Sequence, residues 1–275
     1  MDKLRKSEWE VRDVSLYANE FVINAANIAD HLGNTTDRLC GTKPRICAVG
    51  SMAYAPATPF KLIPREEWPD RISQMEREKT RLSDFILHAG IPCLNQEQTN
   101  YCHANSPALA IMALRAVSGM PLVLLSPASI AGPVTGYRNV GAYIEDDLEQ
   151  ITKVGCASQD FVPPNQIGQS GFRQGWEADA AKHRVREWWD LGARDNLMFD
   201  RMMTMLLSRF PVCVAYNWEG HAVTACDPVM LGRGKFGVRP RNSWGSSYGA
   251  NGFYVLDEQY GTPDAAYVPR SVVQA

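Results

Sequence analysis

The sequence lacks any apolar stretch long enough to cross a lipid bilayer. A membrane-spanning helix needs roughly 18–20 consecutive apolar residues, and no run within the 275 residues approaches that length. Residues 1–10 contain basic side chains with no apolar core behind them, so we expect no secretory signal peptide. These two absences predict a cytoplasmic protein without a membrane partner.

An excess of basic charge is also missing. The chain has 28 Lys and Arg against 30 Asp and Glu, a formal net charge of −2, whereas nucleic-acid binding needs a concentrated basic surface. No C-x-x-C pair and no zinc-type histidine spacing occurs. Residues 232–235 lack the rest of a phosphate-binding motif and are typical of a hairpin tip. We therefore expect no nucleic-acid partner, no metal and no organic cofactor.

Seven cysteines are present, which is an odd number. A chain of this length can bury a hydrophobic core without disulfides, and without an export signal its thiols are expected to stay reduced. Cysteine often behaves as a small buried apolar residue, and we predict that role for Cys40, Cys47, Cys156 and Cys213. The count alone does not say which thiol, if any, performs chemistry.

Hydrophobic periodicity predicts helices in the first two thirds of the chain and strands in the last third. The expected helices cover 18–32 with Gly33 as a stop, a segment from 64 with Ile72, Met75, Leu82 and Ile86 on its buried face, part of 93–117, 142–153, 177–191 and 196–208. The expected strands cover 46–49, 212–216, 222–226, 236–241 and 253–256. Helices first and strands last favour the α+β class.

Three local strings contain residue types suited to nucleophilic catalysis. Cys102 lies where the polar run 95–100 meets the start of an apolar helix, and the positive end of a helix dipole stabilises a thiolate. His221 follows a tight turn at the start of a strand, and the side chain of Asn242 could hold its imidazole in one tautomer. The order along the chain is Cys, His, Asn.

These strings resemble the papain-like cysteine peptidases. The match is most specific in the Asn95-Gln96 pair six residues before Cys102 and in Asn242-Ser243-Trp244-Gly245, followed by Tyr248–Phe253. The resemblance implies an α+β fold in which a helical layer and an antiparallel sheet or barrel layer flank a cleft. It also implies a peptide or protein substrate and needs neither metal nor cofactor.

The resemblance assigns a role to each matching residue. Cys102 would be the nucleophile, His221 the base, and Asn242 the residue that orients His221. Trp244 would shield the His–Asn hydrogen bond from water, and Gln96 would donate its amide to the oxyanion hole. The roles of the substrate-lining glycine and of the oxyanion donor each leave an alternative open. Gly136 or Gly141 could line the substrate cleft, and Gln98 competes with Gln96 for the oxyanion role.

The sequence departs from the family pattern at several points. Thr99 stands where the family has a cysteine, which removes a family disulfide and agrees with a reducing compartment. His103 stands where the family has an aromatic residue, and we expect it to fill the same space in the packing. Pro107 removes a hydrogen bond near the helix start. The segment 212–221 is shorter than the family's and leaves less chain to wall the cleft.

The resemblance covers residues 84–275, with a helical part to about 208 and a sheet-rich part from about 209. Residues 1–83 form an N-terminal extension, either a permanent subdomain or a prosegment. Two other functions stay open: cysteine-dependent acyl transfer to an amine, and a structural or assembly protein that keeps the fold. The remaining histidines His31, His88 and His183 are predicted at the surface or at helix ends.

Overall fold

The computed structural model describes residues 21–45 and 60–272. Along these residues the helices are α1 (Ile28–Thr35), α2 (Trp68–Glu78), α3 (Leu82–His88), α4 (Cys102–Val117), α5 (Ala128–Thr135), α6 (Ile144–Lys153), α7 (Trp176–Ala180), α8 (Met198–Leu207) and α9 (Glu258–Gly261). The strands are β1 (Val22–Ile23), β2 (Val185–Asp190), β3 (Val212–Tyr216), β4 (His221–Gly232), β5 (Lys235–Arg241), β6 (Val255–Asp257) and β7 (Ala265–Val272). No helix in these residues has both the length and the apolar character to cross a membrane.

The strands form one mixed sheet in the order β1-β6-β5-β4-β3-β7-β2. Only the short β1–β6 pair is parallel, and the other pairs are antiparallel. At the centre, β3 and β4 form a hairpin in which Tyr216 lies opposite His221. Both strands are buried along this stretch. The hairpin thus fixes the position of His221, the first residue of β4, relative to β3.

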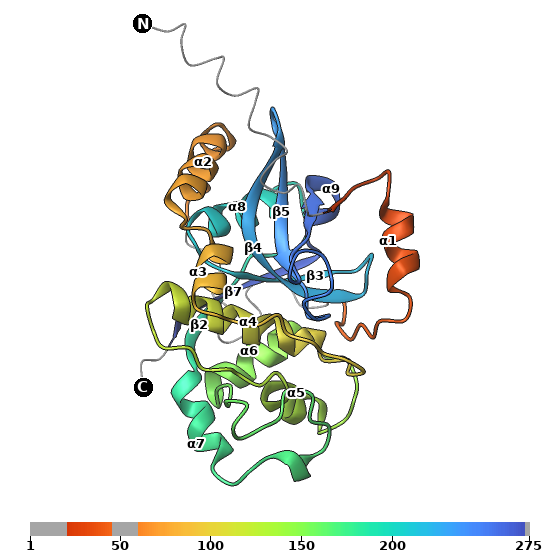
Figure 1. Ribbon diagram of the computed structural model, residues 1–275, viewed down its shortest axis with the longest axis vertical. Coiled ribbons are helices and arrows are strands. Elements are labelled where there is room, and N and C mark those ends of the chain that lie inside the picture. Colours follow the sequence, from red (N-terminus) through yellow and green to blue (C-terminus); the bar gives the residue numbers. More distant parts are fainter. Residues whose placement is uncertain (1–20, 46–59, 273–275) are drawn as a thin grey trace, which may run out of the picture.

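Helices α4 to α7 and the long strands occupy different parts of the molecule, as the α+β prediction requires, whereas α1, α2, α8 and α9 lie beside the strands. Figure 1 shows α5, α6 and α7 gathered at one end, the long strands β4 and β5 at the other, and α4 between them. Every residue of α4 from Cys102 to Arg115 is buried. The Ser106 hydroxyl donates to the carbonyl of Val223 at 2.8 Å, and the Thr224 hydroxyl donates to the carbonyl of Ser106 at 2.9 Å. These bonds fix α4 against β4.

The segment from residue 64, which the sequence predicts to be a single helix, forms two helices, α2 and α3. Lys79 adopts a left-handed conformation with φ 55°, which ends α2 before α3 begins at Leu82. The predicted apolar face is nevertheless buried, and Trp68, Ile72 and Leu82 are at most 1% exposed. The division of the chain at residues 83 and 84 stays a prediction, and it falls within α3.

Two sequence predictions of local structure are wrong. The helix expected over 18–32 is instead a strand at Val22–Ile23 and a helix that begins at Ile28 and continues past Gly33. The helix expected over 177–191 ends at Ala180 and gives way to β2, which pairs with β7. The expected strand at 46–49 lies outside the described residues, as do residues 18–20 of the first helix.

Candidate active site

Four side chains predicted to act together lie at the junction of the helical and sheet halves. Cys102 is the first residue of α4, His221 is the first residue of β4, and Asn242 directly follows β5. Gln96 comes from the loop before α4. All four are buried, with at most 1% of each exposed. The residues therefore come from separate parts of the chain but occupy one enclosed region.

His221 is held by Asn242 and covered by Trp244. Its Nε2 lies 2.8 Å from Oδ1 of Asn242, and the same Oδ1 accepts a hydrogen bond from the backbone N–H of Ser243 at 2.7 Å. Because that second bond fixes Oδ1 as the acceptor, Nε2 of His221 is the donor, which leaves Nδ1 free. The indole of Trp244 stacks on the imidazole at 4.5 Å and closes this side to water.

The electrostatics favour an ion pair between Cys102 and His221. Burial acts to raise the pKa of the Cys102 thiol, but interaction with His221 and, less strongly, with His103 lowers it to about 7. Burial acts to lower the pKa of His221, and the neighbouring thiols of Cys102 and Cys40 raise it well above its usual value. The start of α4 adds the positive end of a helix dipole at the sulfur. A thiolate at Cys102 is thus stabilised near neutral pH.

Gln96 is rigidly oriented by the loop that carries Asn242. Its backbone N–H donates to the carbonyl of Ser243 at 2.8 Å, and the Ser243 hydroxyl donates to its Oε1 at 2.7 Å. Since Oε1 is engaged by the Ser243 hydroxyl, Nε2 is the donor side of the amide, and it donates to the carbonyl of Thr99 at 3.0 Å. The rival Gln98 is exposed. The geometry therefore suits Gln96 to the donor role better than Gln98.

Residues 38–45, which we call the strap, run across the four candidate residues and contact two of them, Cys102 and Gln96. The backbone N–H of Gly41 donates to Sγ of Cys102 at 3.1 Å. The carbonyl of Leu39 accepts from Nε2 of Gln96 at 2.7 Å. Cys40 lies between these two contacts, beside His221, and is partly exposed rather than buried in the core as predicted. The thiol of Cys102 is completely buried, and the strap contributes to covering it through Gly41.

The strap pairs with the chain segment before α6. Ala142 donates to the carbonyl of Gly41 at 2.9 Å, and Lys43 donates to the carbonyl of Ala142 at 3.0 Å, forming a parallel bridge. Gly141 lies directly against the strap, since a Cβ there would come within 2.0 Å of the Gly41 carbonyl oxygen. Gly136, the other glycine considered for the cleft, instead ends α5 in a left-handed conformation.

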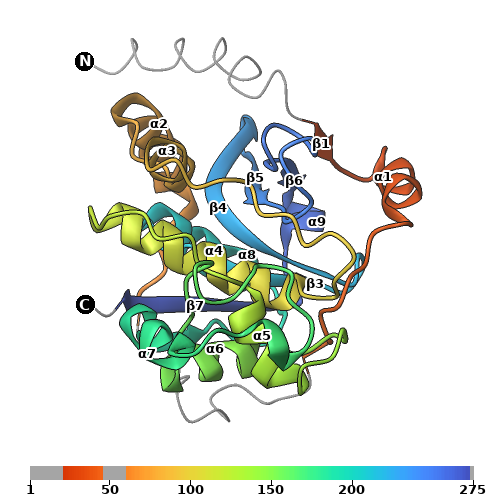
Figure 2. The same ribbon diagram turned by 60° about the horizontal axis from the view of Figure 1, so that its bottom comes forward.

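Both ends of the strap are anchored to the rest of the protein, one beside the candidate site and the other at β2 and β7. At one end the guanidinium of Arg38 lies 5.7 Å from the ring of Trp244. At the other, Arg45 forms a two-armed ion pair with Asp190 of β2 and donates to the Tyr267 hydroxyl at 3.2 Å. In Figure 2 the segment that follows α1 runs from the strand half towards α5 and α6, in agreement with these contacts.

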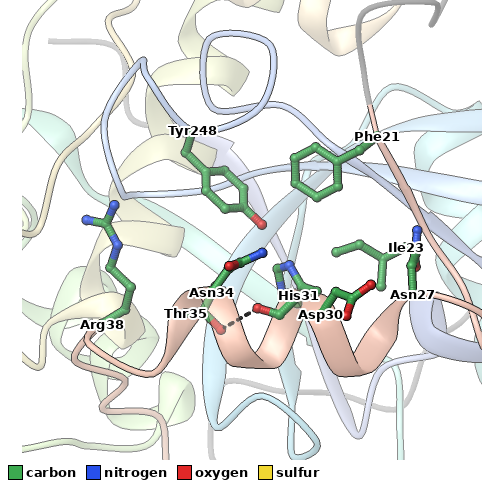
Figure 3. Close-up of a pocket in the computed structure, with 9 residues that line it drawn as sticks. All are labelled: Phe21, Ile23, Asn27, Asp30, His31, Asn34, Thr35, Arg38 and Tyr248. Atoms are coloured by element: carbon green, nitrogen blue, oxygen red, sulfur yellow. Dashed lines mark hydrogen bonds between the residues drawn. The ribbon is translucent and has the colours of Figure 1, made fainter.

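Helix α1 precedes the strap and docks on the turn before His221. Nε2 of His31 lies 2.7 Å from Oε1 of Glu219 in a buried pair, so His31 is not a surface residue as predicted. Its ring packs against Trp218 and Tyr254. A cavity of about 340 Å³ adjoins this helix. Figure 3 shows Phe21 and Tyr248 on its wall opposite α1. None of the four catalytic candidates lines this cavity.

We expect His31→Ala to loosen α1 and expose the strap to proteolysis. A buried hydrogen bond to a charged group contributes about 1.5–3 kcal/mol, so local opening of α1 should become at least roughly tenfold more frequent. Trypsin cleavage after Arg38, followed by mass spectrometry, measures this. Asp30→Ala is the matched control, because Asp30 is exposed on the same helix. Equal cleavage rates in the two variants would contradict a docking role for His31.

His103 and Asp147 form a buried pair that the sequence did not suggest. Nδ1 of His103 lies 2.7 Å from Oδ2 of Asp147, and both side chains are 0% exposed. His103 therefore does fill the position expected of a packing residue, but as one half of an ion pair. His183 is buried but ends the short 3-10 helix Ala181–His183, and His88 is exposed at the end of α3, so both lie at helix ends as predicted. No local sequence signal marks Asp147 as the partner, because 44 residues separate the two.

The predicted departures from the family pattern have visible consequences. Helix α4 continues without interruption through Pro107, so Cys102 keeps its place as the first helical residue. The β3–β4 connection is a tight turn at 217–220, as predicted from the short segment. Within the described residues, no group of three or more His, Cys, Asp or Glu side chains could hold a metal ion.

Comparison with known proteins gives structural matches only. No protein-family model matches the sequence, and no curated protein is similar to it. ProCathepsin B S9 from Trypanosoma congolense superposes with a TM-score of 0.61 at 13% identity, covering 88% of this chain and 89% of that one. Xylellain, a cysteine protease from Xylella fastidiosa, gives 0.58 at 17% identity over 86% and 96%. The bromelain protease from Ananas comosus, in complex with the E64 inhibitor, gives 0.57 at 18% over 71% and 98%.

These similarities establish the fold. The chain has the papain-like cysteine protease fold that its motifs implied, in a divergent form that shares less than a fifth of its residues with each of the three. The match extends over most of the chain rather than over a single motif.

Proposed function

We propose that this chain is a cysteine peptidase that hydrolyses bonds in a peptide or protein substrate. The observation that carries the proposal is the arrangement around the thiol of Cys102, whose pKa is lowered to about 7. The base, His221, is held by Asn242 through Nε2, so its Nδ1 is available to the sulfur. A low-pKa thiol beside an oriented imidazole is the arrangement that nucleophilic catalysis by cysteine requires.

The reaction would proceed through a thioester. The Cys102 thiolate attacks the carbonyl carbon of the substrate, and negative charge develops on the carbonyl oxygen. Imidazolium at His221 then gives its proton to the leaving amine. Water, deprotonated by His221, hydrolyses the thioester and restores the thiol. Because the thiolate forms only above its pKa, activity should be lost as the pH falls below about 7.

Gln96 is the proposed donor to the developing oxyanion. Its Nε2 already donates to a carbonyl oxygen in the cleft, that of Leu39 in the strap. The N–H of Cys102 is a second candidate donor, because the first N–H groups of a helix have no partner within it. One such donor typically lowers the barrier by about 3 kcal/mol. The strap carbonyl thus occupies the position that a substrate oxygen would take.

We further propose that the described state is a closed one. The Gly41 N–H on the sulfur and the Leu39 carbonyl on Gln96 leave no room for a substrate, so the strap has to leave before catalysis. On this view the regulatory part of the extension 1–83 is the strap, whereas α2 belongs to the core. The six cysteines of the described residues are free thiols, which fits the predicted cytoplasmic location.

A thiol-directed electrophilic peptide probe tests the function on the full-length chain. We expect modification at Cys102 that is lost in Cys102→Ala and strongly slowed in His221→Ala, since the latter removes the base. E64, the inhibitor bound to the similar bromelain structure, should compete with the probe. Mass spectrometry of the digested adduct identifies the modified residue, and Cys93, which is partly exposed, serves as the internal reference.

The alternatives give different results in the same assay. Uniform slow modification of the exposed cysteines in the wild type and also in Gly41→Ala, a change that displaces the strap from Cys102, with no effect of His221→Ala, would contradict the peptidase proposal and favour the structural or assembly role. If Cys102 reacts selectively, digestion of a peptide library with and without added amine separates the two enzyme classes. Diversion of the product to the amine would indicate acyl transfer instead of hydrolysis.

A further inference from the structure

The His103–Asp147 pair is buried directly behind the nucleophile and has no part in the mechanism above. His103 follows Cys102 in α4, and Asp147 projects from α6. The two side chains are 2.7 Å apart and neither is exposed to solvent. Burying two ionisable groups is unfavourable unless they compensate one another. The presence of this buried pair therefore suggests that it affects a neighbouring group.

The 2.7 Å contact favours a protonated His103 beside an ionised Asp147, because each charge stabilises the other, although burial raises the pKa of Asp147 above its usual value. Burial acts to lower the pKa of His103, but the charge and hydrogen bond of Asp147 raise it above its usual value. The backbone carbonyl of Val140 also favours the protonated ring. The other titratable groups nearby are Asp146, which faces His103 from α6, and Cys213 of β3, which faces Asp147. Of these, only Asp146 can add charge near neutral pH, and its charge too favours the cation.

The positive member of the pair, His103, is the one that lies next to Cys102 in the chain. Its charge lowers the pKa of the Cys102 thiol. His221 approaches the same sulfur from β4. The thiolate thus lies among two imidazolium rings on different elements and the N-terminus of α4. Inside a buried site such charges act at low effective dielectric and with little screening by salt.

We propose that His103 and Asp147 are positioning residues for the nucleophile: Asp147 keeps His103 protonated, and the His103 cation stabilises the Cys102 thiolate. The inference rests on the proposed function, because it takes Cys102 as the nucleophile. It concerns the state of the thiol and not turnover, so it can be tested without a substrate.

The test is a pH titration of the thiolate by its ultraviolet absorbance, taken as the difference between each protein and its Cys102→Ala counterpart. In the wild type we expect a midpoint near the Cys102 pKa of about 7. Asp147→Asn keeps the shape of the partner but removes the charge, so His103 becomes neutral. The midpoint should then rise by about one pH unit, a roughly tenfold loss of thiolate below the midpoint. Asp146→Asn, the same change at the exposed neighbouring residue, should raise the midpoint by much less, because Asp146 acts on His103 through its charge alone.

Each outcome bears on one proposal. An unshifted or lowered midpoint in folded Asp147→Asn overturns the role of the pair, whereas the absence of any thiolate near neutral pH in the wild type overturns the proposed function. If Asp147→Asn does not fold, the protonation state of His103 in the wild-type protein still tests the role of the pair. The nitrogen chemical shifts of His103 should report an imidazolium at pH 7, and a neutral ring there would overturn the inference.

Discussion

Replacing Gly41 with alanine is expected to raise the rate at which the peptide probe modifies Cys102 by on the order of 100-fold. The probe reaches the sulfur only when the strap opens, so its rate follows the open fraction. A Cβ on Gly41 would lie 1.9 Å from the backbone oxygen of Asn100, which cannot rotate away. The strap would have to lift, and its hydrogen bonds to Cys102 and Ala142 would be lost.

Gly33→Ala is the matched control for this variant. Gly33 lies in α1 on the same N-terminal segment, and a Cβ there would meet nothing within 4 Å. Its rate should stay within a few-fold of the wild type. Modification of Gly41→Ala at the wild-type rate, with the adduct still on Cys102, would mean that the strap does not limit access to the nucleophile.

Trp68→Ala is expected to lower the free energy of unfolding by about 3–5 kcal/mol. The indole of Trp68 is completely buried, its N–H donates to the carbonyl of Ile63 at 2.9 Å, and it packs edge-on against Phe236 of β5 at 5.0 Å. Truncation leaves a large cavity between α2 and the sheet together with an unpaired backbone carbonyl. Denaturant titration followed by circular dichroism measures the change.

Leu87→Ala provides the comparison for Trp68→Ala. Leu87 is an apolar residue of the adjacent helix α3, but it is 50% exposed, and its truncation should cost less than about 1 kcal/mol. If Trp68→Ala were as mild as Leu87→Ala, α2 would be a peripheral addition to the fold. The whole of 1–83 could then be a removable prosegment instead of one that contains a core helix.

The candidate site was predicted from sequence through the resemblance of its short strings to the papain-like peptidases, and local signals at Cys102 and His221 agree with it. Cys102 stands at a change from polar to apolar sequence, which is also where α4 begins, and His221 follows the tight turn that closes the β3–β4 hairpin. Asn242 and Trp244 belong to one short string. In each case the residues that set the local backbone also set the direction of the functional side chain.

The strap and the pair behind the nucleophile were not predictable in the same way. Gly41 contacts Cys102 across 61 positions, and His103 meets Asp147 across 44, so neither contact leaves a periodic pattern. Strand β2 illustrates the same difficulty. Its Trp188-Trp189 stretch is compatible with a helix, and only the distant partner β7 selects the extended conformation. Non-local pairing decided every one of these cases.

The order of the strap in the chain has a consequence for synthesis. Residues 38–45 precede Gln96, Cys102, His221 and Asn242, and ribosomes release the N-terminal part of a chain first. The site cannot assemble until β4 and the Asn242 loop have emerged, and by then the strap is already tethered beside it. If the strap regulates Cys102 as proposed, it is in place to cover the thiol as soon as the site assembles, which would protect the unfinished chain and its neighbours from premature cleavage.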